Sequence, residues 1–302
     1  MVVGIIFGIL ACMIWGAVYI APLLVPTYDP AVLATGRYVI FGMLSVGLAL
    51  SQFKEFRHYK IADWYQALLL GVIGNIFYYW VLAMCVKYSG APIAGAFTAM
   101  IPILVAIIGN SQEKAPERRV AWSSLAMIMV GMVCLNGTEF FYLVGSGRVS
   151  SSDFWIGVAF GAVSLFVWTW YPLKNAAWLQ ANPARSPRSW ASAQGVALFP
   201  AALSLLAYFW WSAPAETGFF GDEPTKFILI CVGLGIVCSW VGIALWNQMS
   251  LRLPRALGGQ MIIFETIFAV IYAHIWRESW PSLLMTVGMT FLLVGIALAM
   301  RV

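Results

Sequence analysis

Charged side chains are scarce in this sequence. Asp, Glu, Lys and Arg make up 10% of the 302 residues, against about a quarter in soluble domains. By contrast, 62% of the residues are hydrophobic and the mean hydropathy is +0.86. A membrane interior leaves backbone amides no hydrogen-bond partners outside helices or closed barrels. Because the apolar runs are long and do not alternate over about ten residues, the composition predicts an all-α integral membrane protein.

Histidine and cysteine are also few, at two and five residues. The cysteines fall inside apolar runs, which favours small buried side chains over disulfides or metal ligands. The sequence has no Gly-x-x-x-x-Gly-Lys-Ser/Thr pattern for binding ATP, and it has no group of His, Asp, Glu and Cys of the kind that a membrane enzyme needs. We therefore expect no catalytic residues, no metal, no cofactor and no enzyme activity.

Runs of about 20 mostly apolar residues mark candidate membrane-spanning helices. Ten such runs occur, at about residues 2–25, 30–52, 63–86, 90–110, 119–137, 154–175, 189–211, 226–249, 255–276 and 281–300. The first run lacks a basic segment before it and a small-residue cleavage site after it, so it is predicted to be retained as a span. The polar stretch 138–153 is predicted to link a first domain, 1–137, to a second, 154–302.

Basic residues are divided unevenly between the two sides that alternate along a ten-span chain. If the N-terminus is cytoplasmic, its side carries Lys54, Arg57, Lys60, Lys114, Arg118, Arg119, Lys174, Arg185, Arg188, Arg252, Arg255 and Arg301. The other side carries only Lys87, Arg148, Lys226 and Arg277. Since cytoplasmic loops are enriched in Lys and Arg, the bias predicts that both termini are cytoplasmic. This topology also explains the net charge of +5 without nucleic acid.

The two halves of the chain resemble each other. Their shared motif is Gly4, Phe7, Gly8 and Trp15, which recurs 153 residues later as Gly157, Phe160, Gly161 and Trp168. Weaker matches align 102–107 with 266–271 and 71–73 with 235–237. Because five spans are an odd number, the second half would lie inverted relative to the first, as in many secondary transporters. The sequence thus predicts ten transmembrane helices arranged as two inverted five-helix repeats.

Several motifs carry a resemblance to a known family. They are the Gly-x-x-Phe-Gly opening followed by Trp in spans 1 and 6, the arginine within Ala34–Tyr38 in span 2, and the Pro or Glu-Thr of spans 4 and 9. With the ten spans, this pattern resembles the drug/metabolite transporter superfamily, EamA type. One departure is Phe264-Glu265-Thr266, where many relatives have Glu-Pro, so the proline that would bend the helix is missing at this position.

Within this superfamily the sequence is most similar to bacterial exporters of aromatic amino acids. The resemblance implies efflux of Phe, Tyr, Trp or related compounds across the bacterial inner membrane, in which the chain would be a multi-pass protein. It implies a fold of two five-helix repeats, in agreement with the internal match.

Central polar and aromatic residues are the candidates for substrate binding, because an inverted-repeat carrier holds its substrate near the bilayer midplane. Rings and methionines suit a planar apolar group, and amides and hydroxyls suit the polar end of an amino acid. The alternative is packing or an interfacial position, where Trp and Tyr are enriched. The candidates are Trp15, Tyr19, Tyr78, Tyr79, Thr98, Met100, Trp168, Trp240, Trp246, Gln260 and Met261.

Arg37 and Glu265 are the two charged residues furthest from the predicted span ends. A charge at the bilayer centre costs on the order of 3 kcal/mol or more, so each is predicted to face the protein interior. There it could fix the structure, contact the substrate or take part in gating; the alternative for Arg37 is a side chain that snorkels toward the membrane interface. Pro102 removes one backbone hydrogen bond from span 4 and is predicted to bend it, as a gate or as a static kink.

The expected function is a secondary transporter that exports amino acids, with aromatic ones favoured, by alternating access through a central cavity. The alternative is a carrier of another metabolite or drug, such as a non-aromatic amino acid, a nucleobase or a cationic drug. A membrane-embedded lipid enzyme and a channel are weaker alternatives, because a catalytic cluster and a repeated selectivity motif are both missing. The expected partners are a small-molecule substrate and the lipid bilayer, and a monomer is compatible with the sequence.

Overall fold

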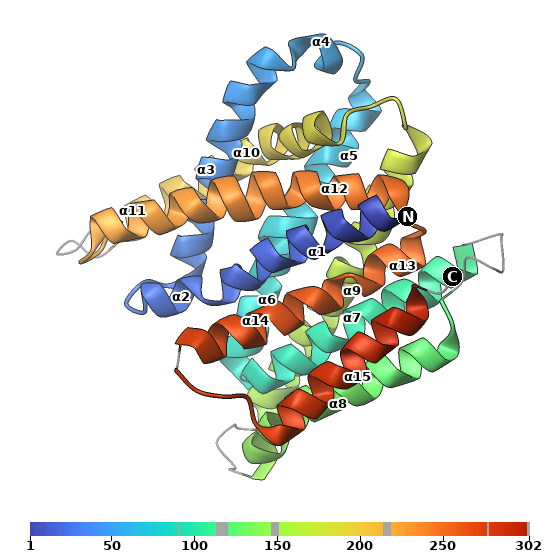
Figure 1. Ribbon diagram of the computed structural model, residues 1–302. Helices are drawn as coiled ribbons and strands as arrows, with labels where there is room; N and C mark the ends of the chain where they lie inside the picture. The colour runs from blue at the N-terminus through green and yellow to red at the C-terminus, as the bar shows by residue number, and fades with distance from the viewer. Residues whose placement is uncertain (90, 113–119, 146–150, 214–218, 277, 301–302) are drawn as a thin grey trace.

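The structure of the chain is a computed structural model. It describes residues 1–89, 91–112, 120–145, 151–213, 219–276 and 278–300. Every regular element among these residues is a helix (Figure 1). The predicted all-α class is therefore confirmed for the described part of the chain.

The helices follow one another with short connections. The first half of the chain forms α1 (Val2–Gly16), a 3-10 turn (Ala17–Tyr19), α2 (Ala21–Leu24), α3 (Pro30–Ser51), α4 (Phe53–Phe56), α5 (Ile61–Gly71), the π-helical segment η2 (Val72–Phe77), α6 (Tyr78–Ser89), α7 (Ala91–Gln112) and α8 (Trp122–Gly145). The second half forms α9 (Ser151–Ala181), α10 (Pro187–Ser212), α11 (Pro224–Gly233), the π-helical segment η4 (Leu234–Val241), α12 (Gly242–Arg252), α13 (Arg255–Gln260), α14 (Ile262–Trp276) and α15 (Leu283–Ala299). Helices α8 and α9 extend into the predicted linker 138–153.

Eight helical stretches of the described chain are long and apolar enough to cross a membrane. They are Val2–Leu24, Pro30–Ser51, Ile61–Ser89, Ile93–Gln112, Phe154–Ala181, Pro187–Ser212, Pro224–Arg252 and Arg255–Trp276. Two shorter apolar helices, Trp122–Leu135 and Leu283–Ala299, coincide with the fifth and tenth predicted spans. The predicted runs are thus apolar helices, whereas ten crossings remain a prediction.

Local sequence signals explain where several helices begin and change character. The side chains of Asp29 and Ser186 cap α3 and α10, whose first residues are Pro30 and Pro187; proline is favoured at this position because its missing N–H would lack a partner anyway. The two π segments interrupt the third and eighth predicted spans. Such segments widen the helical turn by one residue and often mark functional positions.

Glycines allow the closest helix contacts. Helix α8 lies along α15 (Figure 1), and a Cβ on Gly131 would lie 2.8 Å from the carbonyl oxygen of Gly288. Helix α3 packs along α10, where a Cβ on Gly42 would lie 2.2 Å from the Phe199 ring. Small residues let apolar helices approach closely, so these contacts hold together the two halves of the chain.

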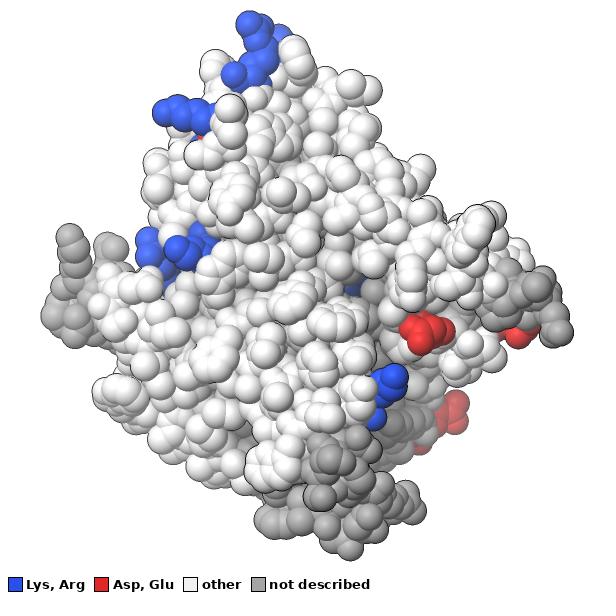
Figure 2. Space-filling view, turned by 180° about the vertical axis from the view of Figure 1, so that it is seen from behind, with Lys and Arg blue, Asp and Glu red and all other residues white. Residues whose placement is uncertain are grey.

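Charge and apolar surface are separated on the molecule. In Figure 2, Lys and Arg gather at the top and left, Asp and Glu lie at the right beside one basic group, and the surface between is uncharged apart from one small recessed basic spot near the centre. Helix α1 begins and α15 ends at the same end of the bundle (Figure 1). Large apolar side chains such as Val133, Phe166 and Leu229 are exposed, as expected for helices that contact lipid.

Candidate functional site

A cavity of about 380 Å³ lies between α1, α3, α6, α7, α9 and α14. Its size falls within the range of about 300–1,000 Å³ that is usual for small-molecule sites. Most of its wall is apolar or aromatic, with a few polar groups. The predicted site residues that line it are Trp15, Tyr19, Arg37, Tyr78, Tyr79, Thr98, Trp168 and Glu265. The tertiary structure therefore brings together aromatic and charged candidates from distant parts of the chain.

One end of the cavity is a stack of aromatic rings centred on Trp168. Its ring stacks on Tyr78 with 4.6 Å between centroids, and on Tyr171 with 4.9 Å. Trp15 lies 6.3 Å from Trp168 and donates a 2.8 Å hydrogen bond from Nε1 to the carbonyl of Cys238. These contacts restrain the rings, so the wall is preorganised to pack against a planar apolar group.

Arg37 is the basic group of the cavity wall. Its Nε donates a 2.8 Å hydrogen bond to Oγ of Ser239 in η4. Ser239 Oγ in turn donates to the carbonyl of Leu234, five residues earlier. Within the described part of the chain, the two terminal NH₂ groups of Arg37 have no protein acceptor. A guanidinium fixed in this way can bind a carboxylate through these groups.

Glu265 is the acidic group of the wall. Its Oε1 accepts a 3.1 Å hydrogen bond from Oη of Tyr19. Among the described residues, the only ion pair within 4.0 Å joins Lys226 to Glu223, so Arg37 and Glu265 do not pair with each other. The wall thus presents a guanidinium group and a carboxyl group at separate places.

Comparisons with known proteins identify relatives of this chain. The EamA-like transporter family matches residues 2–137. The inner membrane protein YtfF of Escherichia coli strain K12 is 31% identical over 309 residues, covering 100% of this chain and 96% of that protein. This chain belongs to the EamA-like transporter family. A solved crystal structure has the same fold, with a TM-score of 0.75 and 15% identity over 98% of this chain and 96% of that one.

The remaining predicted site residues of this EamA-like transporter lie outside the cavity wall. Trp246 is buried, with its ring 5.1 Å from Trp15, and Trp240 donates from Nε1 to Ser192. Gln260 is buried and donates a 2.6 Å hydrogen bond to the carbonyl of Pro102. Met261 is fully buried and Met100 is 40% exposed. None of these positions lines the cavity: the exposed Met100 lies on the surface, and the others pack against neighbouring helices, which leaves any role for them indirect.

The transporter's cavity also includes residues beyond the predicted set. Small and apolar members have no chemical signal that distinguishes them in the sequence, because such residues occur throughout the spans. Asn75 and Tyr171 do carry polar groups, and each lies one turn or less from a predicted site residue. The additional lining residues that matter below are Pro22, Leu33, Ala34, Asn75, Ala83 and Tyr171.

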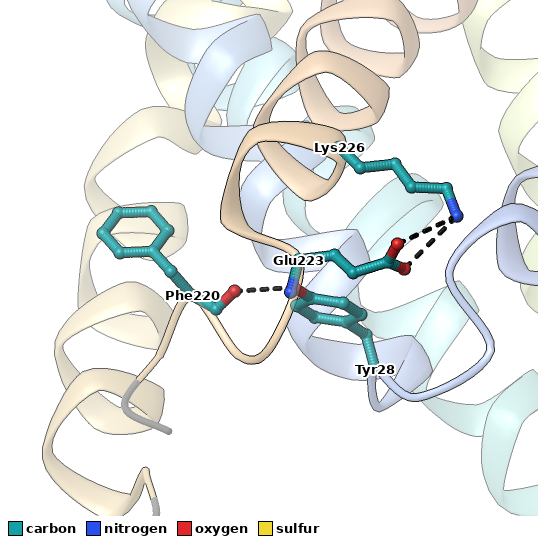
Figure 3. Close-up of polar contacts among 4 residues, drawn as sticks. All are labelled: Tyr28, Phe220, Glu223 and Lys226. Atoms are coloured by element: carbon teal, nitrogen blue, oxygen red, sulfur yellow. Dashed lines mark hydrogen bonds and ion pairs between the residues drawn. The ribbon is translucent and has the colours of Figure 1, made fainter. Parts of the chain in front are cut away.

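A tyrosine fixes the loop beside one end of the transporter's cavity, where Pro22 and Pro30 line the wall. Oη of Tyr28 donates a 2.6 Å hydrogen bond to the Phe220 carbonyl and accepts a 2.9 Å bond from the Glu223 amide (Figure 3). Lys226 pairs with Glu223 at 3.2 Å in the same view. The start of α3 is therefore tied to the start of α11.

Proposed function

We propose that this EamA-like transporter exports aromatic amino acids across the bacterial inner membrane by alternating access through the cavity. The observation that carries the proposal is the combination of Arg37, Glu265 and the ring stack at Trp168 in one cavity wall. The sequence resemblance to the bacterial aromatic amino-acid exporter YddG supports the same substrate class.

The three features suit the three parts of an amino acid. The free NH₂ groups of Arg37 would bind the α-carboxylate, and Glu265 would bind the α-ammonium group. The rings of Tyr78, Trp168 and Tyr171 would pack against an aromatic side chain. Because Arg37 and Glu265 make no ion pair, both remain available for a zwitterion.

Alternating access would use two inverted five-helix repeats, 1–137 and 154–302. Matched contacts in the two halves support this arrangement. Gly8 in the first half faces Met249 and Met261. Its counterpart Gly161 in the second half faces Cys85 and Phe97. Cys85 precedes Met249, and Phe97 precedes Met261, by the same 164 residues. Such agreement is expected when the helices of two repeats pack in the same way.

The side-chain bonds of the π segments agree as well. Asn75 donates to the carbonyl of Leu70, and Ser239 donates to that of Leu234, again 164 residues apart. Close backbone approaches repeat too, with Gly71 against the Gln194 carbonyl and Gly235 against that of Arg37. The third and fourth spans of the first repeat therefore match those of the second repeat at a single offset of 164 residues.

The proposed orientation places both termini in the cytoplasm of a bacterial cell. The separation of basic and acidic groups in Figure 2 supports it, because cytoplasmic loops carry more Lys and Arg. Similarity to a protein named as an inner membrane protein supports the inner membrane as the location. On this topology, the part of the cavity wall formed by Pro22 and Pro30 lies toward the outer face.

A cationic drug or amine is the second candidate substrate. Glu265, held by Tyr19, would bind a cation without any need for a carboxylate. Arg37 in the same wall would repel that cation, so we favour the amino acid.

Transport by purified protein in proteoliposomes tests the proposal. Efflux of radiolabelled Phe, Trp, Thr and a purine would be measured with and without a pH gradient. Saturable movement of Phe and Trp, but not of Thr or the purine, is the expected result, and its response to the gradient decides whether protons drive export. Movement of Thr or the purine in place of Phe and Trp would contradict the aromatic substrate.

A further inference from the structure

A fully buried cluster of polar side chains lies beyond the aromatic end of the cavity. Asn175, Trp190 and Asn247 each have 0% exposure. Asn175 Nδ2 donates a 2.8 Å hydrogen bond to Asn247 Oδ1, and Trp190 Nε1 donates at 2.9 Å to Asn175 Oδ1. These bonds join α9, α10 and α12. We refer to these three residues as the amide cluster.

The amide cluster connects the cavity to the opposite end of the spans. On the cavity side, Gln194 donates to Asn175 Oδ1 at 3.2 Å and accepts from Oη of Tyr171, which lines the cavity. On the other side, Asn247 Nδ2 donates to the carbonyl of Pro187, the first residue of α10. The cluster therefore occupies the space between the cavity and the loop that contains Arg185.

The offsets between the two halves give each cluster residue a counterpart. An offset of 153 residues pairs Asn175 with Pro22, and the 164-residue offset pairs Asn247 with Ala83. The two capped prolines, Pro30 and Pro187, set an offset of 157 for α3 and α10. That offset pairs Trp190 with Leu33.

The counterparts lie in a different environment. Pro22, Leu33 and Ala83 all line the cavity, although Leu33 is also 4% exposed within the apolar core, whereas Asn175, Trp190 and Asn247 are fully buried and hydrogen-bonded to one another. The two ends of the molecule thus differ at three matched positions: one set borders the cavity, and the other fills the space beyond it.

The loops at the two ends do not show this difference. Tyr28 ties its loop to Phe220 and Glu223 at one end. At the other end, the counterpart of Tyr28 is Arg185, which donates to the His58 carbonyl and lies over the Tyr59 ring at 5.2 Å. Because both loop contacts are formed, the difference between the ends is located at the amide cluster and its counterparts.

We propose that the amide cluster is the closed gate on the basic face, and that Pro22, Leu33 and Ala83 form the opposite gate, open in this conformation. The inference rests on the proposed function as an inverted-repeat carrier. In the other state the amide cluster separates and water replaces its hydrogen bonds, while the counterparts close over the cavity. Hydrogen bonds hold the amide cluster together, whereas Pro22, Leu33 and Ala83 could form only apolar contacts with one another. The conformation in which the amide cluster is closed and the cavity is open beside Pro22 is therefore favoured at rest.

Sided labelling of a cavity cysteine tests the gate without any substrate. The five native cysteines are replaced by alanine, and Ala34→Cys, at a position that lines the cavity, is introduced. A membrane-impermeant maleimide should label it from the face that carries Asp29 and Glu223, and at least tenfold more slowly from the face that carries Arg185. Trp190→Leu with Asn247→Ala installs the counterpart residues and should raise labelling from the Arg185 face at least tenfold.

A matched control removes polar contacts elsewhere. Asn110 bonds the amide and the carbonyl of Val120, both at 2.8 Å, and Asn110→Ala should leave labelling one-sided. Equal labelling of the parent from both faces would overturn the inference. So would a gate variant that stays protected on the Arg185 face while labelling normally on the other.

If the gate variant also loses labelling on the Asp29 face, it has misfolded, and disulfide cross-linking decides. The pair Asn175→Cys with Asn247→Cys should cross-link in high yield at rest, and the pair Pro22→Cys with Ala83→Cys in low yield. Equal or reversed yields would refute the gate. Because none of these readouts uses a substrate, a failure of the aromatic amino-acid proposal would leave their outcome unaffected.

Discussion

Arg37 and Ser239 meet across α3 and η4 through a 2.8 Å hydrogen bond from Nε to Oγ. Ser239 is itself held by the carbonyl of Leu234, in the wide turn of a π segment. A local irregularity of one helix thus positions the one basic side chain among the described residues of the cavity wall. The turn lies in the second half of the chain, and the arginine that it positions lies 202 residues earlier in the sequence.

Ser239→Ala should weaken substrate binding without loss of the arginine. A hydrogen bond to a charged group contributes about 1.5–3 kcal/mol, so we expect KM for aromatic amino acids to rise at least tenfold in proteoliposomes. Ser204→Ala is the control, since Ser204 only bonds the Pro200 carbonyl of its own helix. An unchanged KM for Ser239→Ala would show that Arg37 is positioned by other contacts.

Arg37→Gln should discriminate between two substrates, whereas Glu265→Gln should affect both. Loss of the guanidinium should slow flux of Phe at least tenfold and slow phenethylamine, which lacks the carboxylate, much less. Loss of the carboxylate should slow both, because both carry an ammonium group. Competition assays with the two compounds check the pattern, and equal losses for both variants would remove the zwitterion assignment.

Trp168→Leu should lower affinity for aromatic substrates by about two- to tenfold, because an aromatic pair contributes about 0.5–1.5 kcal/mol. Trp246→Leu is the matched control. Trp246 is buried outside the cavity wall, and its Nε1 has no acceptor in the described part of the chain. Isothermal titration calorimetry with Trp as the ligand measures the affinity of each variant without relying on the protein's tryptophan fluorescence. Equal effects of the two substitutions would indicate packing as the role of Trp168.

Tyr28→Phe should destabilise the protein while transport continues. The substitution removes the hydrogen bonds to Phe220 and Glu223 shown in Figure 3, each worth about 1 kcal/mol. A fall in Tm of about 3 °C or more in detergent is expected. An unchanged Tm, or a loss of flux at normal stability, would contradict this purely structural role.

Tyr59 makes stability sensitive to high pH. It lies before α5, outside the spans, and burial raises the pKa of its phenol from 10.0 to about 12. The raised pKa means that its contribution to stability is complete below about pH 10 and is lost as the pH rises through 12. Tyr59→Phe should flatten this decline in thermal unfolding curves, and an equally steep decline in the variant would assign it to other groups.

The sequence by itself determined the class of the protein and the positions of its helices. Apolar runs of about 20 residues have to be helical in a membrane, because their backbone groups find no other partners. The repeated Gly-x-x-Phe-Gly motif also indicated a relation between α1 and α9, whose Trp15 and Trp168 meet at the cavity. Arg37 and Glu265 were distinguishable because a charge inside a span needs a polar environment.

Only the tertiary structure decided which side chains line the cavity and which pack behind it. Trp15 and Trp246 are neighbours of the same residue type, yet only Trp15 belongs to the wall. Gln260 is directed to the Pro102 carbonyl instead. The physical reason is that a membrane helix is apolar on its lipid side as well as on its packed side, so periodicity does not identify the inward face. The rotation of each helix, and with it the amide cluster of Asn175, Trp190 and Asn247, depends on contacts between segments that are far apart in the chain.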